Sequence, residues 1–210
     1  MNLSRMLIPF VLAAGLSLAG CGGGGGSIAS TGGGGIGGTG ITSTGTIDGF
    51  GSIFVNGVEF ETDESDVSLD GVTSTQDKLR LGMVVTVHGT VNDDGKTGTA
   101  DQVVFDDDVQ GPVSAIQPAQ DGDSLLLTVM GVDIIAERTG TVFDGVSFDT
   151  LVVGDLVEVS GFVENGVQLR ATRIEKKSSF VAGISEVEVK GIVSGRTDTT
   201  FNLNTLVVDY

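Results

Sequence analysis

The sequence predicts an all-β protein, made of tandem small antiparallel barrels that follow a signal peptide and a glycine-rich linker. Three observations support this fold class. Valine, threonine and isoleucine recur in short runs broken by glycine and aspartate, as in strands joined by tight turns. Within these runs apolar and polar residues alternate, which is typical of half-buried antiparallel strands. Finally, the same landmarks return in the same order along the chain, which indicates a repeated domain.

Residues 1–20 are predicted to be a signal peptide. Arg5 supplies positive charge, and the apolar run Met6–Ala19 follows it. This run is shorter than the roughly 20 residues that a membrane-spanning helix needs. The string Leu18-Ala19-Gly20-Cys21 resembles the bacterial lipobox, in which the cysteine receives a lipid and becomes the first residue after cleavage. A plain secretory signal followed by a chance cysteine is the alternative.

The lipobox resemblance implies that Cys21 is a lipid-attachment site and that the protein is held at the cell envelope, outside the cytoplasm. The membrane is then a partner through the lipid on Cys21. Gly22 stands where lipoproteins retained at the inner membrane tend to have aspartate, so the outer membrane is the more favoured location. Residues 21–40 are predicted to be a flexible linker, because glycine occupies 12 of the 19 positions from Gly22 to Gly40.

The composition argues against nucleic acids as partners and excludes disulfide bonds within the chain as a source of stability. The formal net charge is −17, and such a surface repels the phosphate backbone of nucleic acids. Cys21 is the single cysteine, so no disulfide can form within the chain. The fold must therefore rest on burial and hydrogen bonding.

Internal similarity divides the rest of the chain. The pattern Leu-x-x-Gly-x-x-Val-x-Val-x-Gly-x-Val begins at Leu79 and again at Leu151, and Gly45, Gly111 and Gly191 each begin a similar upstream strand. We therefore expect one barrel repeat over residues 41–110 and a second over 111–180. Residues 181–210 are predicted to be an incomplete third repeat, because the Leu-x-x-Gly strand does not return.

Each unit is expected to have about five strands and to form an oligonucleotide/oligosaccharide-binding-like (OB-like) barrel. Gly89 and Gly161 interrupt the long strands at equivalent positions and predict bulges or bends. A short helical turn is expected near residues 77–80. The alternation predicts apolar residues that face the core in both copies: Met83, Val85, Val87, Val91, Val157, Val159 and Val163. The polar residues between them are predicted to face outward: Thr86, His88, Thr90, Glu158, Ser160 and Glu164.

A family resemblance lies in four segments: VNGVEF from Val55, LRLGMVVTVHGTV from Leu79, ADQVVF from Ala100 and a new GPV from Gly111. This combination is similar to domain-of-unknown-function family 5666, over about residues 41–210. The resemblance implies secreted or lipid-anchored bacterial proteins with barrel-like repeats. It brings no reaction and no catalytic residues. Copy two departs from the pattern at Met130, where copy one has asparagine.

Candidate catalytic and metal-binding groups are few. His88 is the sole histidine and is expected to be a solvated strand residue. Asp155 and Glu158 are expected on opposite faces of one strand, so they cannot act together as acid and base. The acidic runs 63–66, 92–94 and 106–108 are interpreted as solvated turns, with weak calcium binding as an alternative. We therefore expect no catalytic, cofactor-binding or metal-binding residues.

Two classes of function remain open. The first, which the sequence favours, is a binding or structural module with an envelope protein or glycan as partner, with no enzymatic activity and no cofactor. The second is a carboxylate-dependent envelope enzyme, and a strongly raised pKa at an exposed carboxylate would favour it.

Overall fold

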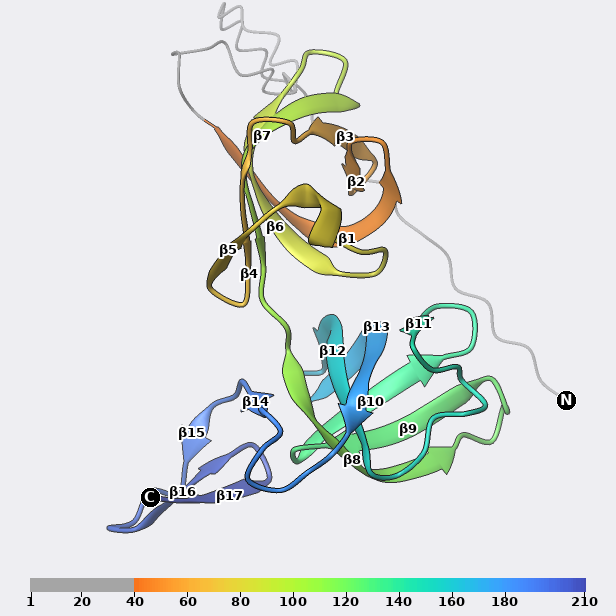
Figure 1. Ribbon diagram of the computed structural model, residues 1–210, viewed down its shortest axis with the longest axis vertical. Helices are drawn as coiled ribbons and strands as arrows, with labels where there is room; N and C mark the ends of the chain where they lie inside the picture. The colour runs from red at the N-terminus through yellow and green to blue at the C-terminus, as the bar shows by residue number, and fades with distance from the viewer. Residues whose placement is uncertain (1–39) are drawn as a thin grey trace, which may run out of the picture. The chain divides into compact units, whose positions relative to one another are not determined.

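The computed structural model describes residues 40–210 (Figure 1). The predicted signal peptide, Cys21 and all of the predicted linker but Gly40 lie outside the described residues. In the described part, no helix has both the length and the apolar character needed to cross a membrane. The regular structure there is almost entirely β, as the sequence predicts.

The first repeat forms a closed five-stranded barrel. Its strands follow the order β3-β2-β1-β6-β7, and a parallel pairing of β3 with β7 closes the ring. This is the OB-like order expected from the sequence. A hairpin of β4 and β5 extends β7 outside the ring, and a short 3-10 turn, η1, precedes β6. The bounds are β1 Ile41–Phe50, β2 Ile53–Val55, β3 Val58–Glu61, β4 Asp66–Leu69, β5 Val72–Ser74, η1 Gln76–Lys78, β6 Val84–Val91 and β7 Thr97–Phe105.

The second repeat has the same topology. Its order is β10-β9-β8-β12-β13, closed by a parallel pairing of β10 with β13, and β11 continues the sheet beyond β13. Strand β11 thus takes the place of β4, but in residues 40–210 no strand pairs with its outer edge as β5 does with that of β4. The bounds are β8 Val109–Pro118, β9 Ser124–Val129, β10 Val132–Glu137, β11 Val142–Asp144, β12 Asp155–Glu164 and β13 Gln168–Ser179.

Each barrel has its own apolar core, centred on residues such as Phe60 and Phe105 in the first and Leu127 and Ile134 in the second. The predicted strand faces are confirmed in copy one, where Val85 and Val87 are fully buried and His88 and Thr90 are exposed. In β6 the alternation of apolar and polar residues predicts burial correctly, because one face of the strand meets the core and the other meets water.

In copy two the predicted faces are partly wrong. Glu158 and Ser160 are buried, although the alternation places them outward. The Ser160 hydroxyl accepts a hydrogen bond from the Val84 amide of copy one, so the outer face of β12 is covered by the other repeat. Val163, predicted to face the core, is 65% exposed because it lies beyond the bulge in β12.

The two strand glycines mark bulges, as predicted. The register of β6 against β7 shifts between His88 and Gly89, and that of β12 against β13 shifts between Ser160 and Gly161. A Cβ atom at Gly89 would lie 2.0 Å from the Thr99 carbonyl oxygen, and one at Gly161 would lie 2.2 Å from that of Arg170. The neighbouring backbone therefore approaches too closely for any side chain at either position.

The glycine that begins each unit is explained by a close contact with a turn residue, which both repeats share. A Cβ at Gly45 would collide with the side chain of Asn56, and one at Gly111 with that of Met130. Both turn residues adopt positive φ, 54° at Asn56 and 47° at Met130. Met130 therefore keeps the turn geometry of its asparagine counterpart, although a left-handed backbone is less favourable for methionine.

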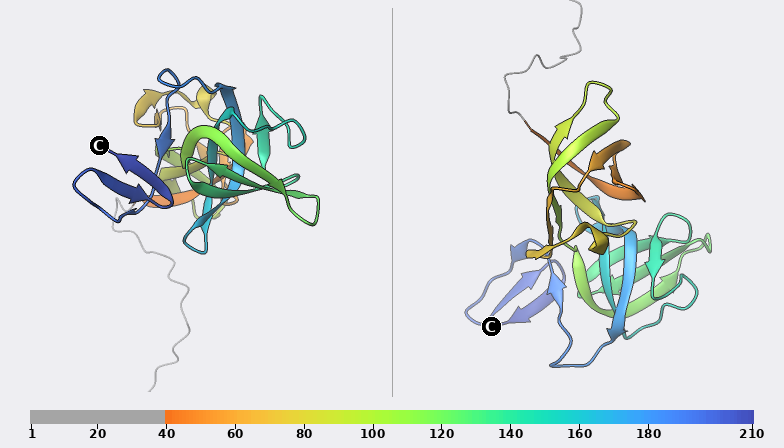
Figure 2. Two further views of the ribbon diagram at one scale, coloured as in Figure 1. Left: turned by 90° about the horizontal axis from the view of Figure 1, so that it is seen from below. Right: turned by 45° about the horizontal axis from the view of Figure 1, so that its top comes forward.

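Residues 181–210 hold two short β segments that contact the second barrel, where the Thr205 hydroxyl donates to the Gly131 carbonyl oxygen at 2.6 Å. Strand β14 (Glu188–Val189) pairs with β8, and the three-stranded sheet β15-β16-β17 follows, in the deepest blue of Figure 2. The bounds are β15 Val193–Ser194, β16 Thr200–Leu203 and β17 Leu206–Asp209. This sheet has the order of β1–β3, and neither of its outer strands pairs with a further described strand. This strand order is the one expected for the start of a third repeat, which stays a prediction.

Candidate functional site

The two repeats meet along a polar seam. The loop between η1 and β6 carries Leu81 and Gly82, whose carbonyl oxygens accept hydrogen bonds from Arg173 Nη1 at 3.2 Å and from the Thr172 hydroxyl at 2.6 Å. Gly82 has φ 83°, and a Cβ there would lie 2.6 Å from the Thr172 carbonyl oxygen. Glycine is therefore required at this position both by its backbone conformation and by the close approach of β13.

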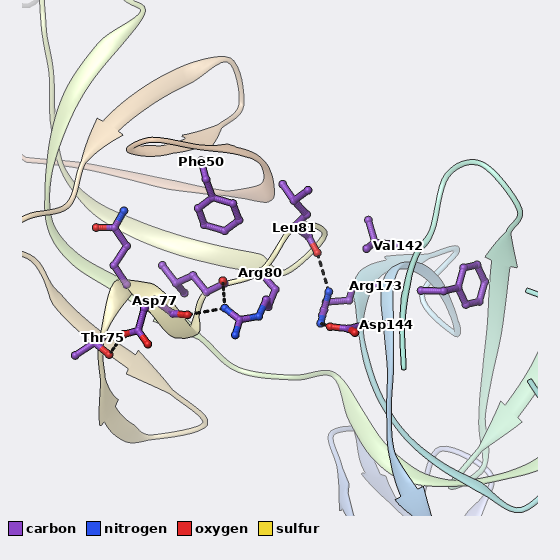
Figure 3. A pocket seen from close by; sticks show the side chains of 11 residues that line it. Phe50, Thr75, Asp77, Arg80, Leu81, Val142, Asp144 and Arg173 are labelled. Atoms are coloured by element: carbon purple, nitrogen blue, oxygen red, sulfur yellow. Dashed lines mark hydrogen bonds and ion pairs between the residues drawn. The ribbon is translucent and has the colours of Figure 1, made fainter. Parts of the chain in front are cut away.

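A cavity of about 870 Å³ opens beside this seam (Figure 3). One wall comes from the β1–β2 turn and the η1 segment, and the other comes from β11 and β13. Three side chains that are large, apolar and yet well exposed line it: Phe50 at 44%, Leu81 at 42% and Val142 at 36% exposed. Their convergence from separate elements gives the cleft an apolar floor open to solvent.

Arg173 forms the polar wall on the side of the second repeat. Its side chain is 4% exposed, and Nη2 donates to Asp144 Oδ2 at 2.5 Å and to Glu175 Oε2 at 3.1 Å. Figure 3 shows it between Leu81 and Asp144. The hydrogen bond from Arg173 lowers the pKa of the Asp144 carboxyl. Arg173 Nε is buried and has no hydrogen-bond partner among the described residues.

Arg80 forms the polar wall on the side of the first repeat. Its Nη1 donates to the carbonyl oxygens of Asp77 at 2.6 Å and of Leu79 at 2.8 Å, so the chain's own backbone holds the guanidinium in place. Asp77 accepts a hydrogen bond from the Thr75 hydroxyl, which lowers the pKa of its carboxyl. Both carboxylates of the cleft, Asp77 and Asp144, are thus ionised at neutral pH and already have donors.

The residues considered from the sequence lie elsewhere. His88 is exposed on β6, as predicted, with the Thr42 hydroxyl 3.0 Å from Nδ1. Asp155 and Glu158 are not brought together: Asp155 pairs with Lys176 and Glu158 with Lys177. In residues 40–210, no group of three or more histidine, cysteine, aspartate or glutamate side chains is placed to hold a metal ion.

The acidic junction 106–108 is not the solvated turn that the sequence predicts. Asp107 is 2% exposed, and burial raises the pKa of its carboxyl to about 7, with the nearby charges of Asp70, Glu188 and Glu158 adding to the effect. Lys190 partly opposes this shift, with Nζ 3.9 Å from Oδ1. Only three residues connect β7 to β8, and the middle one, Asp107, is buried rather than solvated.

Neighbouring contacts hold this connection in place. The Asp108 carboxylate accepts a hydrogen bond from the Gly161 amide at 2.8 Å, and its own amide donates to the Val159 carbonyl at 3.0 Å. The Asp107 amide donates to Asp70 Oδ1 at 2.9 Å. Asp107 Oδ1 itself has no hydrogen-bond partner in the described part of the chain. Asp107 is therefore a buried, poorly compensated acid at the junction, and it does not line the cleft.

The comparison with known families identifies the repeats. The model of a domain of unknown function, DUF5666, matches residues 41–103 and again residues 110–175, together more than half of the chain. The chain belongs to this family. The two DUF5666 matches coincide with the two barrels, which confirms the tandem repeat. A search of curated proteins returned no significant match, and neither did a search of solved structures.

The cleft is built where the two DUF5666 repeats differ. Aligning Leu79 with Leu151 puts Val152 at the position of Arg80. Aligning Ala100 with Ala171 puts Gln102 at the position of Arg173. Sequence reasoning missed both arginines because it searched for shared landmarks. The signal that could have found them is a difference between the copies: a charged residue in one copy whose counterpart in the other copy is uncharged.

Proposed function

We propose that this protein is lipid-anchored at the bacterial cell envelope and binds a small organic ligand in the cleft between its DUF5666 repeats. The observation that carries the binding role is the convergence of Phe50, Leu81 and Val142 on one open cavity of about 870 Å³. Small-molecule sites typically have roughly 300–1,000 Å³ and apolar walls with a few fixed polar groups. Arg80 and Arg173 provide such polar groups here.

A binding role without catalysis agrees best with the charges of the cleft. A general acid or base works best when its pKa lies near the working pH. The pKa values of Asp77 and Asp144 are lowered instead, by the Thr75 hydroxyl and by Arg173 respectively. The carboxyl with a pKa near neutrality, Asp107, is buried at the junction rather than exposed in the cleft. We therefore favour a binding protein over a carboxylate-dependent enzyme.

The binding role is tested with a neutral fluorescent probe. Residues 22–210, produced without the lipid, are titrated with phenyl-naphthylamine, whose emission rises in apolar surroundings. Phe50→Ala should weaken binding by about tenfold, corresponding to about 1.4 kcal/mol of lost apolar contact. Phe162→Ala is the matched control, because Phe162 is 42% exposed and does not line the cavity. Equal affinities for the two variants would contradict binding in the cleft.

The anchoring role rests on the lipobox resemblance of Leu18–Cys21. Two or three acyl chains hold a protein firmly at a bilayer, whereas a single chain binds reversibly. Cys21→Ala should therefore move the protein from the membrane fraction to the soluble extracytoplasmic fraction and abolish labelling by radioactive palmitate. Ser30→Ala, in the same linker, is the control and should leave the fractionation unchanged. A Cys21→Ala protein that stays membrane-bound after a salt wash would show that lipid is not the anchor.

A further inference from the structure

Arg80 keeps unused hydrogen-bond donors at the cleft. Arg80 uses Nη1 for two backbone carbonyls, while Nε and Nη2 donate to no described residue. The acceptors differ. Asp144 receives the Arg173 guanidinium, and Asp77 receives the Thr75 hydroxyl and lies 3.5 Å from Lys78 Nζ. An incoming molecule therefore finds an unfilled cationic donor next to an apolar surface, and carboxylates that are already paired.

We propose that the ligand is a small amphiphilic anion, whose carboxylate, sulfonate or phosphate head accepts hydrogen bonds from Arg80 while its apolar body lies against Phe50, Leu81 and Val142. This inference rests on the proposed function, since it names the chemistry of the ligand for the same cleft. Arginine suits this role because its planar fork offers parallel donors to such oxyanions.

The geometry prepares Arg80 for this contact. Its bonds to the carbonyls of Asp77 and Leu79 fix the guanidinium at the edge of the cavity, so little side-chain freedom is lost on binding. Arg173 has another role. Its charge is matched by Asp144 and Glu175, and its bond to the Leu81 carbonyl ties the two walls together. Arg80 is thus the contact residue for the head group, and Arg173 is a positioning residue.

The overall charge of the chain acts against an anion, but at longer range. A net charge of −17 repels anions on approach, and salt screens that field beyond about 8 Å at physiological ionic strength. At contact distance the charge-assisted hydrogen bond from Arg80 dominates, because such bonds are roughly twice as strong as neutral ones. A cationic amphiphile would have to compete for Asp77 and Asp144 with the chain's own cations, Lys78 and Arg173.

The test compares two probes with the same aromatic body. Anilinonaphthalene sulfonate carries an anionic group, and phenyl-naphthylamine is its uncharged analogue. Both are titrated into residues 22–210 carrying Arg80→Gln or the matched control Lys96→Gln. Lys96 is an exposed cation that does not line the cavity, so its loss changes the net charge equally. Arg80→Gln should weaken binding of the sulfonate about tenfold and leave the neutral probe unchanged, while Lys96→Gln should change neither.

The outcomes separate this inference from the proposed function. If the neutral probe depends on Phe50 but the sulfonate does not depend on Arg80, the cleft binds ligands and the anionic class is wrong. An equal effect of Arg80→Gln and Lys96→Gln on the sulfonate would also overturn the inference. If neither probe depends on Phe50, the proposed function itself fails.

The same variants distinguish two sources of the anion. A free acid is represented by dodecanoate, which should displace the neutral probe from the wild-type cleft and do so less well from Arg80→Gln. A membrane lipid is represented by phosphatidylglycerol vesicles, with phosphatidylcholine vesicles as the uncharged control. Arg80-dependent retention on phosphatidylglycerol alone would identify a lipid head group, whereas Arg80-dependent displacement by dodecanoate alone would identify a free acid. Displacement equal to that by dodecyltrimethylammonium, with no dependence on Arg80, would refute the anionic class.

Discussion

Replacing Asp107 with asparagine should stabilise the protein at alkaline pH, although the residue lies in the connection between two domains. Burial raises the pKa of this carboxyl from 3.8 to about 7, and Asp70, Glu188 and Glu158 add to the shift while Lys190 opposes it. Asparagine has the same shape and carries no charge. The substitution therefore removes the cost of ionising a buried group, with little change in packing.

The sign and size of the effect follow from proton linkage. Because the pKa of Asp107 is higher in the folded state, the folded protein keeps its proton between about pH 4 and pH 7 while the unfolded chain loses it. Stability from this group therefore falls as the pH rises through that window, and the full penalty is present above pH 7. Raising the pKa of Asp107 from 3.8 to about 7 corresponds to about 4 kcal/mol. The advantage of Asp107→Asn over wild type should thus grow by up to about 4 kcal/mol from pH 4 to pH 8.

The assay is urea unfolding of residues 22–210, followed by circular dichroism at several values between pH 4 and pH 8. Asp106→Asn is the matched control, because Asp106 is the preceding residue and is exposed. Its difference from wild type should be small and nearly constant with pH. If the difference between Asp107→Asn and wild type is the same at pH 4 and pH 8, Asp107 is not a costly buried acid and the reasoning is refuted.

Three further predictions concern the repeats. Met130→Asn should change the stability of the second barrel by less than about 1 kcal/mol, because the lower cost of positive φ for asparagine is offset by the loss of Met130's packing against the core; a large change in melting temperature in either direction would contradict this. Residues 109–180 alone should unfold cooperatively, since they contain all strands of the second barrel and most of its core, and a disordered circular dichroism spectrum would count against it. In a verified monomer, amide hydrogens in residues 200–209 should exchange faster than those of β12, because the outer strands of their sheet are unpaired. Strong protection there without contacts to the second barrel would mean that this segment folds alone.

Structural features that depend on a single repeat are predicted well from the sequence. The alternation around Val85 and Val87 identifies the core face of β6, and the matched glycines Gly89 and Gly161 locate the bulges. Those features depend on local backbone geometry and on burial against a single core. The OB-like order also follows, because five short strands with one long bent pair have few ways to close.

The sequence does not predict what depends on contact between the repeats. Ser160 is buried because the other repeat covers it, and Asp107 is buried because the connection between the barrels is short. Arg80 and Arg173 lie far apart in the chain, and each stands where the other copy has an uncharged residue. A pattern search treats such positions as surface variation, because nothing local shows that the loop carrying Arg80 meets the strand carrying Arg173.

The barrel-closing ladders also have a consequence for how the chain reaches its native state. The parallel pairing of β3 with β7 joins strands of the first repeat, and that of β10 with β13 joins strands of the second. Neither ring needs a residue from the other repeat to close. The slow step should therefore be loop closure inside one repeat, with a rate set by the sequence separation of those strands and not by total chain length. A chain that emerges amino terminus first can complete one ring before the next begins, which limits how much unpaired strand edge is exposed to neighbouring chains at any moment.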